Sequence, residues 1–147
     1  FLQYSQLDAI ERIKILPILI GADLDQQQFA VDMKEALLES GKNAVFIVSS
    51  DFTHYGRQYR YIPFEEKPQE QVAALDKGAI DYIKKIDPAG FMAYVKEKDA
   101  TICGARAIEL LLRTIKAQKV LLEQYYTSTV VSGDEKNSVS YASIIFK

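Results

Sequence analysis

The feature that most constrains the fold is a pair of short apolar runs with a helical pattern between them. Residues 13–20 (IKILPILI) and 44–49 (AVFIVS) are nearly continuous in branched apolar side chains, which is typical of strands buried on both faces of a sheet. Asp23 or Asp25 offers an N-cap for a helix through about Ser40. A strand, a helix and a strand in this order form a right-handed βαβ unit, so the pattern predicts a parallel sheet.

The rest of the chain has the pattern of helices followed by a hairpin. Apolar residues at helical spacing indicate three helices: 68–86, one starting at Asp87 and Pro88, and one capped by Thr101 that runs to about residue 115. Two strand-like runs, 120–131 and 139–146, flank the turn-rich stretch SGDEKNS and predict an antiparallel hairpin. The fold class is therefore α/β. We expect a three-layer α/β/α arrangement with a mainly parallel sheet and a C-terminal antiparallel hairpin, as one domain or part of one.

Charge, cysteine content and the length of the apolar runs exclude several classes of protein. The net charge is −2 and the sequence pI is about 5.5, so the basic footprint of a nucleic-acid-binding protein is missing. The longest apolar run, 15–20, is far shorter than a membrane span. Cys103 is the single cysteine, and the start of the chain lacks the pattern of a signal peptide. We therefore expect no membrane or nucleic-acid partner and a reducing, cytoplasmic location.

The first candidate for chemistry follows the second predicted strand. Open parallel sheets bind ligands beyond the carboxyl ends of their strands, and here that position is occupied by Ser50, Asp51 and, three residues later, His54. His54 is the only histidine in the chain. It would serve as an acid, a base or a metal ligand oriented by Asp51. The alternative is that Asp51 only caps the following turn and His54 is a surface loop residue.

The second candidate is Cys103, which we expect in the first turn of the helix capped by Thr101. The amide donors and the positive dipole end of a helix favour a thiolate there, so a nucleophile or a metal ligand is physically reasonable. The alternative is a small buried apolar residue, since free cysteine is among the most buried residue types. Four further residues would line the same pocket: Tyr55, Arg57, Arg106 and Tyr141. The alternatives are that Tyr55 covers the core and that the arginines are solvated or paired. Sequence motifs for nucleotide phosphate loops and nucleophile elbows do not occur.

Four motifs in the same order resemble the Memo family. The stretch VSSDFTHYGRQYRY (48–61) resembles a family segment that reads SSD, two residues, His, an aromatic residue and Gly. The family motif TICG stands intact at 101–104, SVSYA stands at 138–142, and ILPILIG (15–21) resembles the strand that precedes them. The resemblance therefore spans nearly the whole chain.

The resemblance implies a fold similar to class III extradiol dioxygenases, whose non-haem iron is held by two histidines and a carboxylate. In the Memo family it implies a pocket with two N-terminal histidines and the TICG cysteine, here Cys103, in place of the carboxylate. His54 resembles the acid/base histidine beside that metal, and Asp51 is its motif partner. Since the two histidine ligands belong to the half of the family sequence that is absent here, residues 1–147 are expected to be the C-terminal portion of one Memo-like domain with an incomplete metal site.

Two functions follow from this resemblance. The first is a redox-metal pocket, because a thiolate and an imidazole suit iron or copper better than magnesium or calcium. The second is a non-catalytic module that recognises phosphotyrosine peptides through Arg57 or Arg106, or partner proteins. The family's link in prokaryotic genomes to a radical-SAM protein and a small companion protein (an AmmeMemoRadiSam-type system) implies a shared pathway. An unpaired sheet edge also predicts a homo-oligomer or poor solubility.

Overall fold

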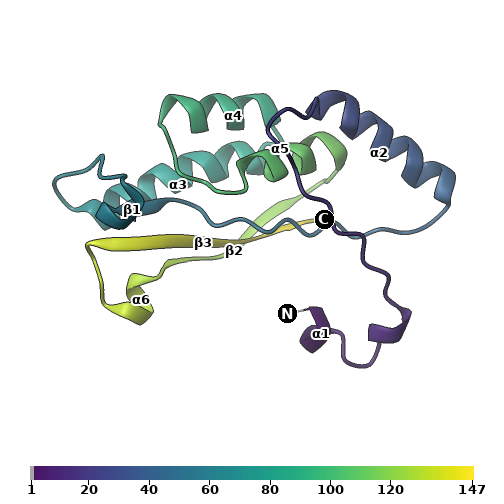
Figure 1. Cartoon of the computed structure of the whole chain (residues 1–147), viewed down its shortest axis with the longest axis horizontal. Helices are drawn as coiled ribbons and strands as arrows, with labels where there is room; N and C mark the ends of the chain where they lie inside the picture. The colour runs from purple at the N-terminus through teal and green to yellow at the C-terminus, as the bar shows by residue number, and fades with distance from the viewer. Residues whose placement is uncertain (1) are drawn as a thin grey trace.

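The computed structural model describes residues 2–147 of the chain (Figure 1). These residues form helices, two 3-10 turns and three strands. In chain order the elements are α1 (Leu2–Ser5), η1 (Ile10–Arg12), α2 (Gln26–Ser40), β1 (His54–Gly56), η2 (Arg57–Tyr59), α3 (Pro68–Lys84), α4 (Pro88–Glu97), α5 (Ala105–Thr114), β2 (Val120–Thr127), α6 (Thr129–Ser132) and β3 (Asn137–Phe146). No helix among residues 2–147 is long and apolar enough to cross a membrane.

The three strands form one antiparallel sheet in the order β1-β3-β2. His54 in β1 pairs with Val139 in β3. The predicted C-terminal hairpin is confirmed by the pairing of β2 with β3, although β2 ends at Thr127 and the short helix α6 occupies 129–132, where the strand was expected to continue. The long strand β3 therefore lies between β1 and β2 and holds the sheet together.

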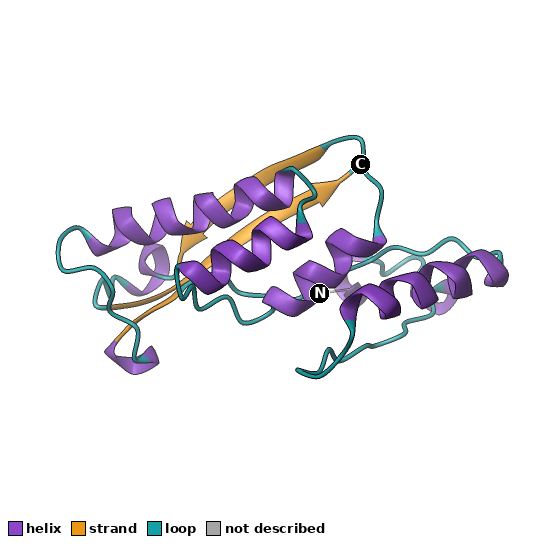
Figure 2. Ribbon diagram, turned by 90° about the horizontal axis from the view of Figure 1, so that it is seen from above, coloured by secondary structure: helices purple, strands orange, loops and turns teal. Residues whose placement is uncertain are grey.

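Helices α3, α4 and α5 lie side by side on one face of this sheet (Figures 1 and 2). Their inward faces and the residues next to β1 share one apolar core, because helical spacing places these side chains on a single stripe of each helix. Its buried members are Phe52, Tyr61, Leu75, Ala79, Ile80, Ile83, Phe91, Ala100, Ile102, Ala105, Ile108 and Leu112. Helix α2 packs against α5 at one end of this layer. The α/β class is thus correct, with helices and sheet in two layers.

Several predicted helix boundaries are confirmed by their caps. Asp25 caps α2 by accepting hydrogen bonds from the amides of Gln27 and Gln28, at 3.0 Å each, and Gly41 ends it in the left-handed region with φ 60°. Asp87 caps α4. The predicted cap of the next helix is wrong: α5 begins at Ala105, and its N-cap residue is Gly104.

The predicted parallel sheet is not supported by the structure. Residues 13–20 and 44–49 are not strands, and every strand pair among residues 2–147 is antiparallel. A strand requires a neighbouring backbone to pair with, whereas an apolar run only indicates that its side chains prefer burial. Without such a neighbour, both segments remain extended and carry exposed apolar side chains, including Leu19 at 98% and Val45 at 89% exposure.

A buried carboxylate joins α3 to the sheet layer. Asp76 is fully buried, and one of its oxygens accepts hydrogen bonds from the amide and the hydroxyl of Thr53, at 3.2 and 2.6 Å. The other oxygen accepts from the hydroxyls of Tyr125 in β2, at 2.7 Å, and Ser140 in β3. Burial raises the pKa of Asp76 above its usual range, and the hydrogen bonds from Ser140, Thr53 and Tyr125 oppose that rise.

The raised pKa of Asp76 predicts a specific pH dependence of stability. Because the folded state holds this proton more tightly than the unfolded chain, the contribution to stability is fully present below the unfolded pKa and is lost as pH rises through the folded pKa. The Asp76→Asn variant cannot ionise there. We expect the free energy of unfolding of the wild-type protein to fall relative to that of the variant as pH rises from about 4 to 8.

Urea unfolding of both proteins across this pH range checks that expectation. Asp81→Asn, at an exposed position of the same helix, is the matched control and should follow the wild type. A constant difference between the wild-type protein and Asp76→Asn at all pH values would contradict the prediction.

The exposed apolar segments predict self-association of the 147-residue chain. In the double variant Leu19→Lys, Val45→Lys we expect less self-association, since charge disfavours pairing of open backbone edges, and a change in stability within about 0.5 kcal/mol. Light scattering after size-exclusion chromatography measures the mass against concentration. Val131→Lys, at a residue of α6 that is 87% exposed, is the control. Unchanged association in the double variant would show that these segments are not responsible.

Candidate functional site

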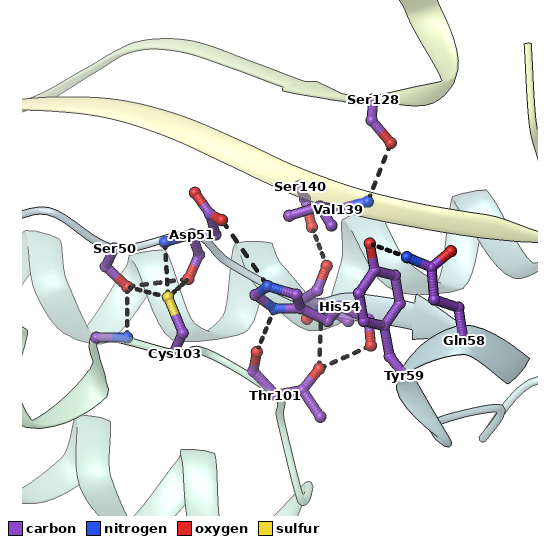
Figure 3. Close-up of polar contacts among 12 residues, drawn as sticks. Ser50, Asp51, His54, Gln58, Tyr59, Thr101, Cys103, Ser128, Val139 and Ser140 are labelled. Atoms are coloured by element: carbon purple, nitrogen blue, oxygen red, sulfur yellow. Dashed lines mark hydrogen bonds and ion pairs between the residues drawn. The ribbon is translucent and has the colours of Figure 1, made fainter. Parts of the chain in front are cut away.

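Three predicted site residues come together in the structure. Asp51 precedes β1, His54 is its first residue, and Cys103 lies in the loop before α5. Each offers one ligand atom, and these atoms all lie within 4.8 Å of one another. Figure 3 shows the three side chains converging between β3 and the α4–α5 loop. The cluster is therefore made by two segments that are about fifty residues apart in the chain.

The two segments approach closely because one of them carries a glycine. The amide of Gly104 donates a hydrogen bond to the Ser50 hydroxyl at 2.9 Å. A Cβ atom on Gly104 would lie 2.4 Å from the Cβ of Ser50 and 2.9 Å from the carbonyl oxygen of Ser49. Neither contact is compatible with a side chain, so glycine is required for Cys103 to reach Asp51.

Thr101 fixes the position of His54. Its hydroxyl accepts a hydrogen bond from the His54 amide at 2.8 Å and lies 2.9 Å from the His54 carbonyl oxygen, to which it donates. The Thr101 carbonyl oxygen lies 2.9 Å from Nδ1 of the His54 ring. Since a carbonyl oxygen can only accept, Nδ1 carries the proton in this contact and Nε2 of the neutral ring has a free lone pair.

The free nitrogen of His54 faces Asp51. Nε2 lies 3.8 Å from Oδ2 of Asp51, and both side chains are partly exposed. The sulfur of Cys103 accepts a hydrogen bond from the Asp51 amide at 3.2 Å and lies 4.0 Å from the Ser50 hydroxyl. Cys103 is exposed, so the alternative of a buried apolar residue does not hold.

Tyrosine side chains border the cluster on the sheet side. The ring of Tyr59 meets the ring of His54 edge-on, with centroids 5.1 Å apart, and Tyr141 in β3 contacts Tyr126 in β2 at 5.3 Å. The pKa of Tyr141 is raised by burial and then by the charge of Asp51. Tyr141 is thus close enough to the cluster to sense its charge.

The other predicted pocket residues lie elsewhere or have different contacts. Tyr55 is buried, and its hydroxyl donates to the carbonyl of Phe64 at 3.3 Å, because successive strand residues point to opposite faces. Arg106 donates to the carbonyl oxygens of Gly21 and Leu24, at 3.1 and 2.9 Å, and so holds the loop before α2. Arg57 is exposed in η2.

Thr101 and Asp76 are the residues that the sequence analysis missed. Thr101 has the sequence context of a helix cap, and nothing local distinguishes a cap from a contact to a distant histidine. Asp76 did carry a signal. It lies four residues after Val72 and four before Ile80, so a charged side chain falls on the apolar stripe of α3.

Comparison with known proteins assigns the family. The sequence profile described as Memo-like protein matches residues 1–145. The chain belongs to the Memo family. It is similar to a MEMO1 family protein of Pyrococcus horikoshii, with 33% identity over 100% of this chain and 53% of the relative. It is also similar to one of Desulfurococcus amylolyticus (34%, 92% and 46%) and to the human protein MEMO1 (32%, 90% and 48%). This Memo-family chain spans about half the length of the curated relatives it matches.

The close approach at Gly104 predicts a large effect of a single methyl group. In Gly104→Ala we expect the free energy of unfolding to fall by about 1–3 kcal/mol, because the added carbon overlaps Ser50 and the Ser49 carbonyl. Urea unfolding measures this. Gly21→Ala, where nothing lies within 4 Å of the added carbon, should leave stability nearly unchanged. Equal stability of the two variants would mean that the segments separate without cost.

Proposed function

We propose that this Memo-family chain contributes Asp51, His54 and Cys103 to a redox-metal pocket that holds iron or copper and resembles the extradiol dioxygenase site. Cys103 is the proposed ligand, and His54 acts beside it as a second ligand through Nε2 or as the acid/base group, with Asp51 as its partner. The observation that carries the proposal is the convergence of three donor atoms within 4.8 Å.

The orientation of His54 supports this proposal. With Nδ1–H bound to the Thr101 carbonyl, the Nε2 lone pair faces an oxygen of Asp51 at 3.8 Å. Two lone pairs that face each other are favourable only with a proton or a cation between them. Metal-binding histidines typically donate their second ring N–H to a carbonyl or carboxylate, as His54 does to Thr101.

The spacing and the chemistry of these donors also fit a metal. Catalytic metal sites commonly use three protein ligands at about 2.0–2.3 Å, which sets the ligand atoms roughly 3–4 Å apart. Small rotations of the partly exposed Asp51 and the exposed Cys103 would bring their atoms into that range. Sulfur and imidazole nitrogen favour iron or copper(I) over magnesium or calcium.

A bound redox metal would supply electron transfer and Lewis acidity to a substrate in this pocket. The residues of this chain would do the rest. His54 is placed to accept or return a proton at Nε2, since Thr101 occupies Nδ1. Tyr59, whose ring meets the imidazole edge-on, would restrict access of water to that side of the His54 ring.

We further propose that residues 1–147 are the C-terminal portion of a single Memo-like domain. The relatives are about twice as long, and 13–20 and 44–49 expose apolar side chains with no strand beside them. Additional chain would supply those neighbours, the remaining metal ligands and a sheet with parallel strands. The reducing environment that an exposed cysteine requires makes the cytoplasm the proposed location.

The second candidate is a non-catalytic module for phosphotyrosine peptides or partner proteins. Exposed Arg57 shares η2 with Tyr59, whose ring contacts His54, and a guanidinium group suits a phosphate. Arg106 supports this function less, because its guanidinium already binds two carbonyl oxygens. Peptide binding through Arg57 should survive chelation of metal, whereas the metal function should not.

Anaerobic reconstitution of the complete protein that contains residues 1–147 with iron(II) or copper(I), followed by dialysis and elemental analysis, tests the metal pocket. We expect the wild-type protein to retain metal and Cys103→Ser to lose at least about tenfold in affinity. His54→Gln separates the two roles of that residue. If His54 is a ligand, the variant should lose the metal. If His54 is the acid/base group, the variant should still bind the metal. Asp51→Asn should weaken metal binding, because Asp51 is the proposed partner of His54, and the matched control Asp81→Asn, at an exposed position of α3, should not. Equal retention by the wild-type protein and Cys103→Ser would contradict the proposal.

A further inference from the structure

Asp76 contacts Thr53, the residue before His54, and takes no part in the chemistry proposed above. It is fully buried on α3, and its partners among the described residues are hydroxyls and an amide, with no cation among them. A buried carboxylate without a cation is costly. Replacing such a polar group and its partners by apolar groups of the same shape is often neutral for stability. Stability alone therefore gives little reason for a carboxylate here.

The contacts of Asp76 end on the residue next to His54. One carboxylate oxygen holds both the amide and the hydroxyl of Thr53. On the other side of Thr53, its carbonyl oxygen accepts from the amide and the hydroxyl of Ser140, each at 3.1 Å. The Ser140 hydroxyl also reaches Asp76. Every polar group of Thr53 is thus engaged with Asp76 or Ser140.

Thr101 holds His54 from the opposite side, as described above (Figure 3). The backbone of 53–54 is therefore clamped between α3 and the α4–α5 loop. The contact between Nδ1 and the Thr101 carbonyl oxygen requires one orientation of the imidazole ring relative to the backbone. If Thr53 could shift, the same ring could turn and present either nitrogen to the cluster.

We propose that Asp76 is a positioning residue for His54: by holding Thr53, it keeps the imidazole in the tautomer that presents Nε2 to Asp51 and Cys103. The contact with Thr53 needs one acceptor oxygen and no particular charge. An amide in the same place should therefore perform the role, with its NH2 group toward the hydroxyl oxygens of Tyr125 and Ser140, and an apolar side chain should not. This inference rests on the proposed metal pocket for its functional meaning. The tautomer itself is a property of the metal-free protein.

The single histidine of the chain makes the tautomer directly measurable. In metal-free, nitrogen-15-labelled protein, long-range proton–nitrogen correlation spectra distinguish a protonated Nδ1 from a protonated Nε2. We expect the wild-type protein and Asp76→Asn to show mainly the Nδ1–H tautomer, and Asp76→Leu to show a mixture. Affinity for copper(I) should fall about tenfold or more in Asp76→Leu and stay within about threefold in Asp76→Asn.

Two further variants separate positioning from simple stability. Tyr125→Phe removes a donor to Asp76 but leaves the contacts to Thr53, so it should lower stability without changing the tautomer. Thr53→Val removes the 2.6 Å hydrogen bond and should shift the tautomer in the same direction as Asp76→Leu. It also serves as the test if Asp76→Leu does not fold.

The outcomes are distinct. A wild-type tautomer in Asp76→Leu or, if that variant does not fold, in Thr53→Val would overturn the inference, as would an equal tautomer change in Tyr125→Phe. If the wild-type protein binds no copper(I) but the tautomer shifts as expected, the metal pocket fails and the positioning role of Asp76 stands. If copper(I) binds equally to all variants and the tautomer is constant, the metal pocket stands and Asp76 has only a structural role.

Discussion

The hydrogen bonds around residues 53–54 are the constraint on which the rest of the structure depends. β1 has only three residues, too few to define its own position. Its place is set by Asp76 from α3, by Ser140 from β3 and by Thr101 from the loop before α5. Because these partners come from the helix layer, the sheet and a loop, the segment joins all parts of the core at one point.

The candidate site depends on the same point. Its three donor atoms belong to side chains of modest length, so they converge only if the two backbone segments come close. Gly104 permits that approach by having no side chain, and Thr101 then determines which nitrogen of His54 faces the cluster. The site is thus built mainly from backbone contacts, and its polar groups are oriented before any ligand binds, as preorganised sites require.

The first third of the chain has a different character. Residues 13–20 and 44–49 have the composition of buried strands, yet they expose most of their apolar side chains and pair with no strand among residues 2–147. In the rest of the chain, from Phe52 onward, the buried apolar side chains pack with those of α3, α4 and α5. The part of the chain from Phe52 onward therefore buries its own apolar side chains. Residues 13–20 and 44–49 present the kind of apolar surface that proteins cover with further strands or with partners.

The sequence by itself determined the four longer helices α2 to α5, the C-terminal hairpin, the family and the three residues of the cluster. Asp25 and Asp87 cap helices through amides two or three residues away, so their effect can be predicted locally. Only the tertiary structure decided the antiparallel sheet, the contact between Thr101 and His54, and the hydrogen-bond partners of Asp76. His54 and Thr101 are 47 residues apart, and Asp76 binds residues from three other segments. Such contacts depend on how the elements pack, and no local pattern encodes that packing.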